Sequence, residues 1–273
     1  MQGRNHRQTQ VVNYNNINGM RKLKILVTND DGHLSPGIQA LADAVKIFGE
    51  VTVMAPDQNA SATSSCLTVI RPLRVGQTEK GFYYINGTPC DCVHVALSGI
   101  IGFKPDLIVS GINNGANLGD DTIHSGTFGA AQEGYLFRIP SISFSLASRE
   151  WTYLDTAKRI IHELMRRLLE RHHIGAGYTG EPWLLNVNIP GCSYDEIQGT
   201  ELTRLGMRKV SQPAVRAQDP YGHDVYWVGM LGAPDNPQPG TDFHAVANGR
   251  VSITPMHVNM TDCENMDMWG FLS

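Results

Sequence analysis

A strand–turn–helix–strand pattern over residues 23–55 constrains the fold of this chain more than any other feature. Its first run, LKILVT at Leu23–Thr28, is β-prone and ends in the turn-forming cluster Asn-Asp-Asp-Gly. Apolar residues then recur at offsets of 0, 3, 4, 7 and 10 from Ile38 to Phe48, which traces one face of a helix, and Pro36 stands where a helix start tolerates proline. The second β-prone run, VTVMA, closes a βαβ unit, and this unit predicts a parallel sheet.

The same alternation continues along the chain. Further strands are predicted at residues 68–75, 82–85, 106–110, 141–146, 183–189 and 251–254, and helices at 88–101, 128–137 and 155–172. Residues 205–240 are rich in Gly, Pro and polar groups, which predicts an extended β-hairpin arm. The expected fold class is α/β: a three-layer, Rossmann-like, mostly parallel sheet flanked by helices, with the arm attached.

Composition and charge exclude several classes of protein. With 41% hydrophobic and 18% charged residues among 273, the chain can bury a sizeable core. A net charge of −4 argues against a nucleic-acid polymer as a stable partner, and no apolar run reaches the roughly 18 residues of a membrane span. Five cysteines without a Cys-x-x-Cys spacing predict reduced thiols in a cytoplasmic protein.

The first 19 residues differ from the rest. They are rich in Asn and Gln and lack the apolar stretch of about 7–15 residues that a secretory signal needs. We expect residues 1–19 to be a disordered polar extension, and residues 20–273 to form a single α/β domain.

Adjacent carboxylates follow the first predicted strand, where open parallel sheets bind their ligands. Asp30 and Asp31 repel each other unless a cation lies between them, and oxygen ligands of this kind suit Mg²⁺, Mn²⁺ or Ca²⁺. A solvated turn that caps the next helix explains the same residues. The turn at residues 57–61 follows the second strand and can add a ligand at the same edge.

Two further polar segments come after the strand predicted at residues 106–110. The loop SGINNGANLGDD supplies amide groups on a flexible backbone, or is merely flexible. Ser125, Gly126 and Thr127 precede a helix, where free N–H groups and the helix dipole favour an anion such as phosphate, although an ordinary helix cap explains them equally. A cation site and an anion-binding helix start at one sheet edge together predict hydrolysis of a phosphate monoester.

At these loops the sequence resembles the SurE family of metal-dependent 5′/3′-nucleotidases, also called stationary-phase survival proteins. The resemblance runs from about residue 20 to residue 258. It rests on the ordered blocks TNDDG, PGIQAL, APDQNASATSS, GTPCDCV, SGINNGANLGDDTIHSGTFGAAQEG, PGTDFHAV and VSITPMHV.

The resemblance implies the roles of particular residues. It places one divalent ion per subunit, Mg²⁺ or Mn²⁺, on Asp30, Asp31, Ser61 and Asn113. It makes Asp30 the candidate for activating the attacking water. The residues that it places on the phosphate side are Asn117, Ser125, Gly126 and Thr127.

The resemblance also implies a homodimer or homotetramer that exchanges the arm and the C-terminal segment between subunits. The expected substrate is a nucleoside 5′-monophosphate, with 3′-monophosphates as further substrates. One alternative is a haloacid-dehalogenase-type phosphatase that forms an aspartyl-phosphate, although its motif separates two Asp by one residue whereas Asp30 and Asp31 are adjacent. The other is a nucleotide or metal sensor without turnover.

Overall fold

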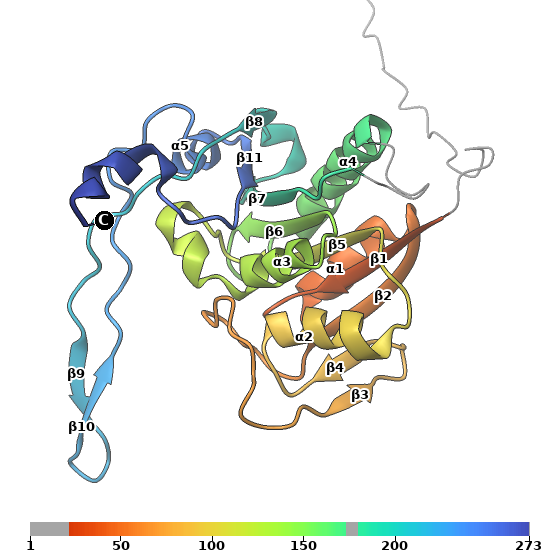
Figure 1. The fold of residues 1–273 in the computed structure, drawn as a ribbon, viewed down its shortest axis with the longest axis horizontal. Coiled ribbons are helices and arrows are strands. Elements are labelled where there is room, and N and C mark those ends of the chain that lie inside the picture. The colour runs from red at the N-terminus through yellow and green to blue at the C-terminus, as the bar shows by residue number, and fades with distance from the viewer. Residues whose placement is uncertain (1–21, 173–179, 273) are drawn as a thin grey trace, which may run out of the picture.

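A large central sheet organises the protein, as a computed structural model that describes residues 22–172 and 180–272 shows (Figure 1). The extension expected at residues 1–19 lies outside the described residues. Within them the sheet has the order β3-β4-β2-β1-β5-β6-β7-β11-β8. Its strands are β1 Leu23–Thr28, β2 Gly49–Pro56, β3 Val75–Gln77, β4 Tyr83–Ile85, β5 Leu107–Asn114, β6 Ser141–Ala147, β7 Leu184–Pro190, β8 Thr200–Leu202 and β11 Val251–Met256.

The centre of the sheet is parallel, as the βαβ pattern predicts. β1 pairs in parallel with β2 on one side and β5 on the other, and β6 and β7 continue in the same direction. Antiparallel pairing occurs where β3 meets β4 and where β11 meets β7. The carboxyl ends of β1, β2 and β5 therefore meet at one edge, where the polar loops follow them.

Helices cover both faces of the sheet and complete three layers (Figure 1). They are α1 Pro36–Val45, α2 Pro89–Val95, α3 Gly126–Leu136, α4 Leu154–His172 and the short α5 Asp242–Ala247. Ile25 and Val27 of β1 belong to the apolar layer with α1 and α4, whereas Leu26 belongs to the layer with α2 and α3. Successive strand side chains point to opposite faces, so β1 is buried on both sides and the predicted α/β class is confirmed.

The first helix starts as its sequence predicts. Pro36 occupies the first turn of α1, and the Ser35 hydroxyl accepts a hydrogen bond from the Ile38 N–H at 3.3 Å. The Asn29 amide donates to the Gly32 carbonyl and the Ser35 hydroxyl, which fixes the turn between β1 and α1.

The segment from residue 68 to residue 75 differs from its predicted strand. Only Val75–Gln77 pairs, as the short edge strand β3, and Val69 and Ile70 are 86% and 94% exposed. Pro72 has no N–H for a strand ladder, and no neighbouring strand covers the two apolar side chains. The prediction missed β8, α5 and the 3-10 helix Cys263–Leu272.

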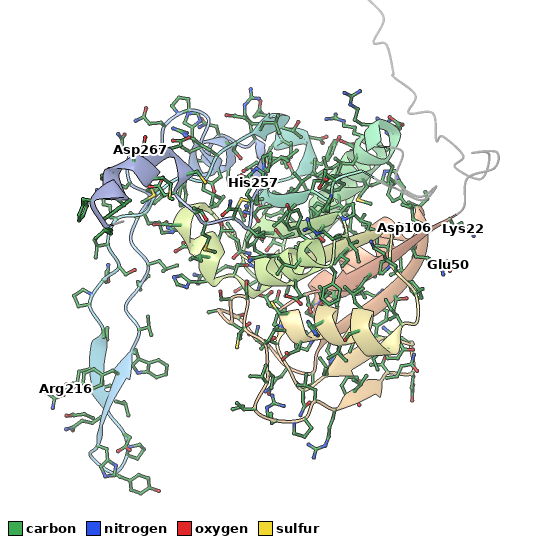
Figure 2. The ribbon with its side chains drawn as sticks, in the orientation of Figure 1. Lys22, Glu50, Asp106, Arg216, His257 and Asp267 are labelled. Carbon is green, nitrogen blue, oxygen red and sulfur yellow. The ribbon has the colours of Figure 1, made fainter. Side chains whose placement is uncertain are left out.

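The predicted arm is present as an antiparallel hairpin that projects from the body (Figure 1). Its strands are β9 Val215–Gln218 and β10 Asp224–Trp227, and Tyr226 and Trp227 on it are 65% and 69% exposed. Figure 2 shows Arg216 on the arm, far from Lys22 and Asp106 across the molecule. Within the described residues, no helix combines the length and apolar character needed to cross a membrane.

Candidate active site

Asp30 is held at the junction of β1 and α3. Its side chain is 3% exposed, and its Oδ1 accepts a hydrogen bond of 2.5 Å from the hydroxyl of Thr127, which is itself fully buried. A Cβ on Gly126 would lie 2.9 Å from the Asp30 Cβ and 3.1 Å from its Oδ2, so only glycine allows the helix start to approach this closely. The Asp30 carboxylate, two residues after β1, therefore lies directly against the first turn of α3.

Asp31 joins two other loops. Its Oδ2 accepts a hydrogen bond from the Asn114 N–H at 3.2 Å, and its Oδ1 accepts one from the Asn59 amide at 3.4 Å. The Ala60 N–H donates to the Asp30 carbonyl at 2.8 Å. The loop after β2 and the carboxyl end of β5 thus converge on the two carboxylates, as the topology of the sheet predicts.

Burial raises the pKa of both carboxyl groups. For Asp30, loss of solvation is the largest cause, and the Thr127 hydrogen bond opposes it. The pKa of Asp31 rises to about 6, mainly through burial and then through the neighbouring charge of Asp30, against the Asn114 N–H. No ion pair between described residues involves either carboxylate, so this concentration of negative charge has no cationic side chain to compensate it.

Ser61 lies on the same loop as Asn59, and Asn113 precedes Asn114 at the carboxyl end of β5. Ser61 is exposed, and its N–H donates to the Asn59 Oδ1 at 3.0 Å. The Asn113 amide donates to the Gly115 carbonyl at 2.8 Å, which leaves its Oδ1 as an acceptor. A register shift in the β5–β6 pairing falls between Ser110 and Asn113, where the chain leaves the regular ladder.

The start of α3 has the ordinary helix cap that its sequence allows. Ser125 is buried and caps the helix, since its Oγ accepts a hydrogen bond from the Phe128 N–H at 3.0 Å. Thr127 binds Asp30, and Gly126 lies between the two. The helix start thus contacts Asp30, and its first-turn N–H groups carry the positive end of the helix dipole.

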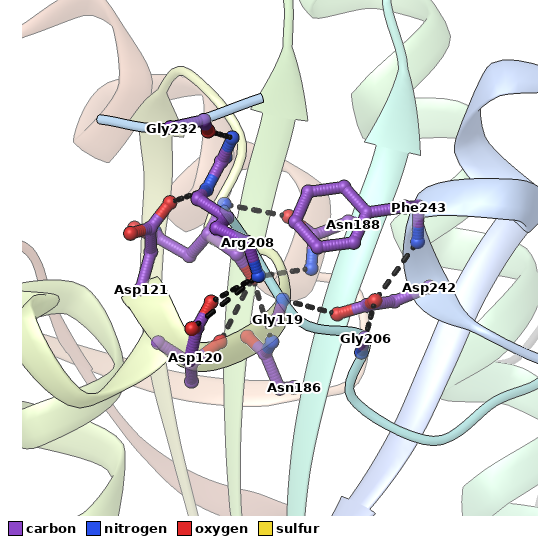
Figure 3. A network of polar contacts seen from close by, with 12 residues as sticks. Gly119, Asp120, Asp121, Asn186, Asn188, Gly206, Arg208, Gly232, Asp242 and Phe243 are labelled. Carbon is purple, nitrogen blue, oxygen red and sulfur yellow. Dashed lines mark hydrogen bonds and ion pairs between the residues drawn. The ribbon is translucent and has the colours of Figure 1, made fainter. Parts of the chain in front are cut away.

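Asn117 is built into the sheet rather than left free in its loop. Its N–H donates to the Asn188 Oδ1 and its amide to the Ser145 hydroxyl, both at 2.8 Å. Its carbonyl accepts from the amides of Asn186 and Asn188, both at 2.9 Å. Figure 3 shows these two asparagines, which occupy alternate positions of β7.

Sequence reasoning missed Asn186 and Asn188, although a signal was present. The run WLLNVNI places Asn at alternate positions of an otherwise apolar strand, and both side chains are fully buried. A buried amide needs hydrogen-bond partners, so this alternation indicates a polar contact on one face of β7.

The donor groups at this edge fit a hard divalent cation. Carboxylate, amide and hydroxyl oxygens are available on Asp30, Asp31, Asn113 and Ser61, and such oxygens are the ligands of Mg²⁺ and Mn²⁺. Among the described residues, no group of three or more His, Cys, Asp or Glu is placed to hold a metal, so a cation here would also need the amide and hydroxyl oxygens. The uncompensated carboxylate pair supplies the charge that a divalent cation needs.

These features define a Rossmann-like α/β protein with an acidic site at the carboxyl edge of its sheet. The family model described as "Survival protein SurE" matches residues 25–212, and the chain belongs to the SurE family. The resemblance drawn from its motifs is thereby confirmed.

Two relatives and one solved structure match this chain over most of its length. A protein of Polaromonas sp. named 5′-nucleotidase SurE is 50% identical over 250 residues, which cover 90% of this chain and 96% of that one. One of Albidiferax ferrireducens with the same name is 48% identical over 91% of this chain and 96% of its own. The crystal structure of the SurE protein from Aquifex aeolicus matches with a TM-score of 0.77 and 39% identity, over 91% of this chain and 99% of that one.

Proposed function

We propose that this protein is a divalent-metal-dependent phosphomonoesterase that hydrolyses nucleoside 5′-monophosphates, and also 3′-monophosphates, to nucleoside and phosphate. The names of its relatives support a nucleotidase. The observation that carries the proposal is the 2.5 Å hydrogen bond from Thr127 to Asp30, because it joins the carboxylate proposed to hold the cation to the helix start proposed to bind phosphate.

One divalent ion per subunit, Mg²⁺ or Mn²⁺, would be held by Asp30, Asp31, Ser61 and Asn113. When bound, it would polarise a phosphoryl oxygen and lower the pKa of the attacking water. The all-oxygen donor set supports this assignment, as does the absence of an ion pair to either carboxylate among the described residues.

The phosphate-side residues orient the substrate. The N–H groups of Gly126 and Thr127 at the start of α3 would donate to phosphoryl oxygens, where the helix dipole stabilises charge that develops in the transition state. Ser125 would fix this turn as its cap. Asn117 would hold the preceding loop through its contacts with β6 and β7.

Asp30 would accept the proton of the attacking water. Its Oδ1 accepts the Thr127 hydrogen bond, which leaves Oδ2 for this role. The water oxygen forms a bond to phosphorus as the bond to the ribose oxygen breaks, and the departing oxygen takes up a proton to give the nucleoside.

We extend the proposal to assembly and location. A homodimer or homotetramer that exchanges the arm and the C-terminal segment would cover the exposed apolar side chains there, among them Trp227, Trp269 and Phe271. Residues 20–273 would form one domain, and the protein would act in the cytoplasm.

Phosphate release from AMP and GMP with Mn²⁺ or Mg²⁺ tests the proposed function. We expect activity in the wild type and in Asp57→Asn, which changes an exposed carboxylate of the loop after β2. We expect its loss in Asp30→Asn, in Asp31→Asn and in EDTA. Equal activity of all four proteins, or full activity in EDTA, would overturn it.

Two outcomes would point to the alternatives. Recovery of a phosphorylated enzyme after acid quenching would favour an aspartyl-phosphate mechanism. Nucleotide binding at equilibrium without phosphate release from any substrate would favour a sensor.

A further inference from the structure

The root of the arm, where residues 206–208 and 232–242 join the arm to the body, binds the segment that leads into α3 (Figure 3). This segment is the 3-10 helix Gly119–His124, and α3 begins two residues after it. Asp242, where α5 begins, accepts hydrogen bonds from the Gly119 N–H at 2.6 Å and from the Gly206 N–H at 2.9 Å. One carboxylate therefore joins both ends of the arm-bearing stretch, residues 206–242, to the loop before the helix start.

Arg208 makes a second connection between the same two parts of the chain. Its N–H donates to Asp120 Oδ1 at 3.1 Å, and its guanidinium forms an ion pair with Asp121 through Nε. The same guanidinium donates to the Gly232 carbonyl at 2.9 Å and lies 4.8 Å from the centre of the Phe243 ring. Arg208, on one chain segment of the arm root, thus connects Asp121 with Gly232 on the other segment.

The Arg208–Asp121 pair is shielded from solvent. The two side chains are 20% and 15% exposed, so their attraction is screened less than that of a surface pair. The arm itself carries a contrasting pair, Arg216 with Asp224, whose side chains are 63% and 37% exposed.

The chain packs tightly around Gly119. Gly119 has φ +60°, and a Cβ there would overlap the Phe243 ring and lie 2.8 Å from the Gly206 carbonyl oxygen. Asp242 is fully buried, and its third hydrogen bond comes from the Phe243 N–H at 2.8 Å. A shift of the arm root would therefore move the 3-10 helix with it.

The 3-10 helix is connected in turn to the candidate active site. The Ser125 N–H donates to the Thr122 carbonyl at 3.2 Å, and the Ser64 N–H donates to the His124 carbonyl at 3.1 Å. Ser64 lies on the loop that carries Ser61, and Ser125 caps α3.

We propose that Arg208 is a positioning residue, which acts through Asp121 to set the place of the α3 start against Asp30. Asp242 is the second anchor of the same segment. The proposal rests on the proposed function in so far as its effect is read in phosphate release. A misplacement of a catalytic group by about 1 Å can lower the rate about a hundredfold. Partial loosening of the α3 start is therefore expected to lower kcat about tenfold.

Steady-state kinetics of five variants test this role. Arg208→Met and Asp121→Asn should each lower kcat for AMP about tenfold, and the double variant should lose no more than either single one, because both remove the same contact. Millimolar guanidinium should restore part of the activity of Arg208→Ala, since it can occupy the vacated position beside Asp121. Arg216→Met, the matched control on the arm, should retain wild-type kcat.

Hydrogen exchange gives a readout that is independent of activity. In Arg208→Met, amides of residues 119–127 should exchange faster than in the wild type, whereas those of β1 and β6 should not change. Should Arg208→Met fail to fold, Asp121→Asn carries the same test, because it removes one charge and keeps the shape.

The results separate the two proposals. An inactive wild type overturns the proposed function, and exchange at residues 119–127 still tests the connection. An active wild type overturns this inference if Arg208→Met and Asp121→Asn keep wild-type kcat, if their losses add in the double variant, or if guanidinium restores nothing.

Discussion

The hydrogen bond from Thr127 to Asp30 gives the sharpest test of how the site is built. Thr127→Val keeps the branched shape of the side chain and removes its hydroxyl, which donates to Asp30 Oδ1 over 2.5 Å. Both groups are buried, so water cannot replace the lost donor without opening the site. A hydrogen bond to a charged group contributes roughly 1.5–3 kcal/mol, and its loss leaves a buried carboxylate oxygen without this partner.

The expected effect on activity follows from that magnitude. A loss of about 2 kcal/mol in the transition state corresponds to a roughly 30-fold lower kcat/KM, because every 1.4 kcal/mol is about tenfold. The loss in the free energy of unfolding should be smaller in metal-free protein, because Asp30 can take up a proton once its donor is gone. The assay is phosphate release from AMP at fixed Mn²⁺, with thermal unfolding measured on the same samples.

Two matched variants control this experiment. Thr127→Ser keeps the hydroxyl and should retain most of the activity. Thr156→Val makes the same substitution at another buried threonine, in α4, and should leave kcat/KM unchanged. If Thr127→Val has the kcat/KM of the wild type, the hydrogen bond does not organise the site and the reasoning is wrong.

Three further predictions concern packing, pH and the polar contacts of β7. Gly126→Ala should lower the free energy of unfolding by about 1–3 kcal/mol in denaturant titrations, because the alanine Cβ would lie 2.9 Å from the Asp30 Cβ. An unchanged free energy of unfolding would show that α3 can shift. In metal-free protein, the free energy of unfolding should fall by about 2 kcal/mol as the pH rises from about 4 to 7. The reason is that Asp31, with its pKa raised to about 6, binds more protons in the folded than in the unfolded protein in that range. A rise in the free energy of unfolding would contradict the assigned shift. Asn188→Leu should cost about 2–4 kcal/mol in unfolding free energy, since it leaves the Asn117 N–H without its acceptor, whereas a neutral substitution would argue against that contact.

Local patterns account for what could be predicted of the fold. β1, its turn and α1 are adjacent in sequence, and their periodicities differ clearly, so the βαβ unit and the α/β class followed from the residues alone. β8 has three residues and α5 six, which is too short for either period to show. Residues 68–74 have strand composition but no neighbouring strand, and pairing is a tertiary property.

The candidate site was likewise predictable where it depends on local sequence, and not where it depends on packing. Asp30 and Asp31 could be found because they follow a strand in a turn, and in the structure Asp31 contacts the loop after β2 and the last residue of β5. The contact between Thr127 and Asp30 spans 97 positions in sequence, and only the packing of α3 on the sheet creates it. The metal and phosphate roles of these residues stay predictions.

Reconstitution of activity with metal tests the central claim most directly. Protein freed of metal with EDTA and then returned to EDTA-free buffer is titrated with Mn²⁺, while phosphate release from AMP is followed. The account predicts no release at the start and a rise that saturates near one ion per subunit, with no comparable rise in Asp31→Asn. Full phosphate release before any metal is added would contradict it, and so would an identical titration curve for Asp31→Asn.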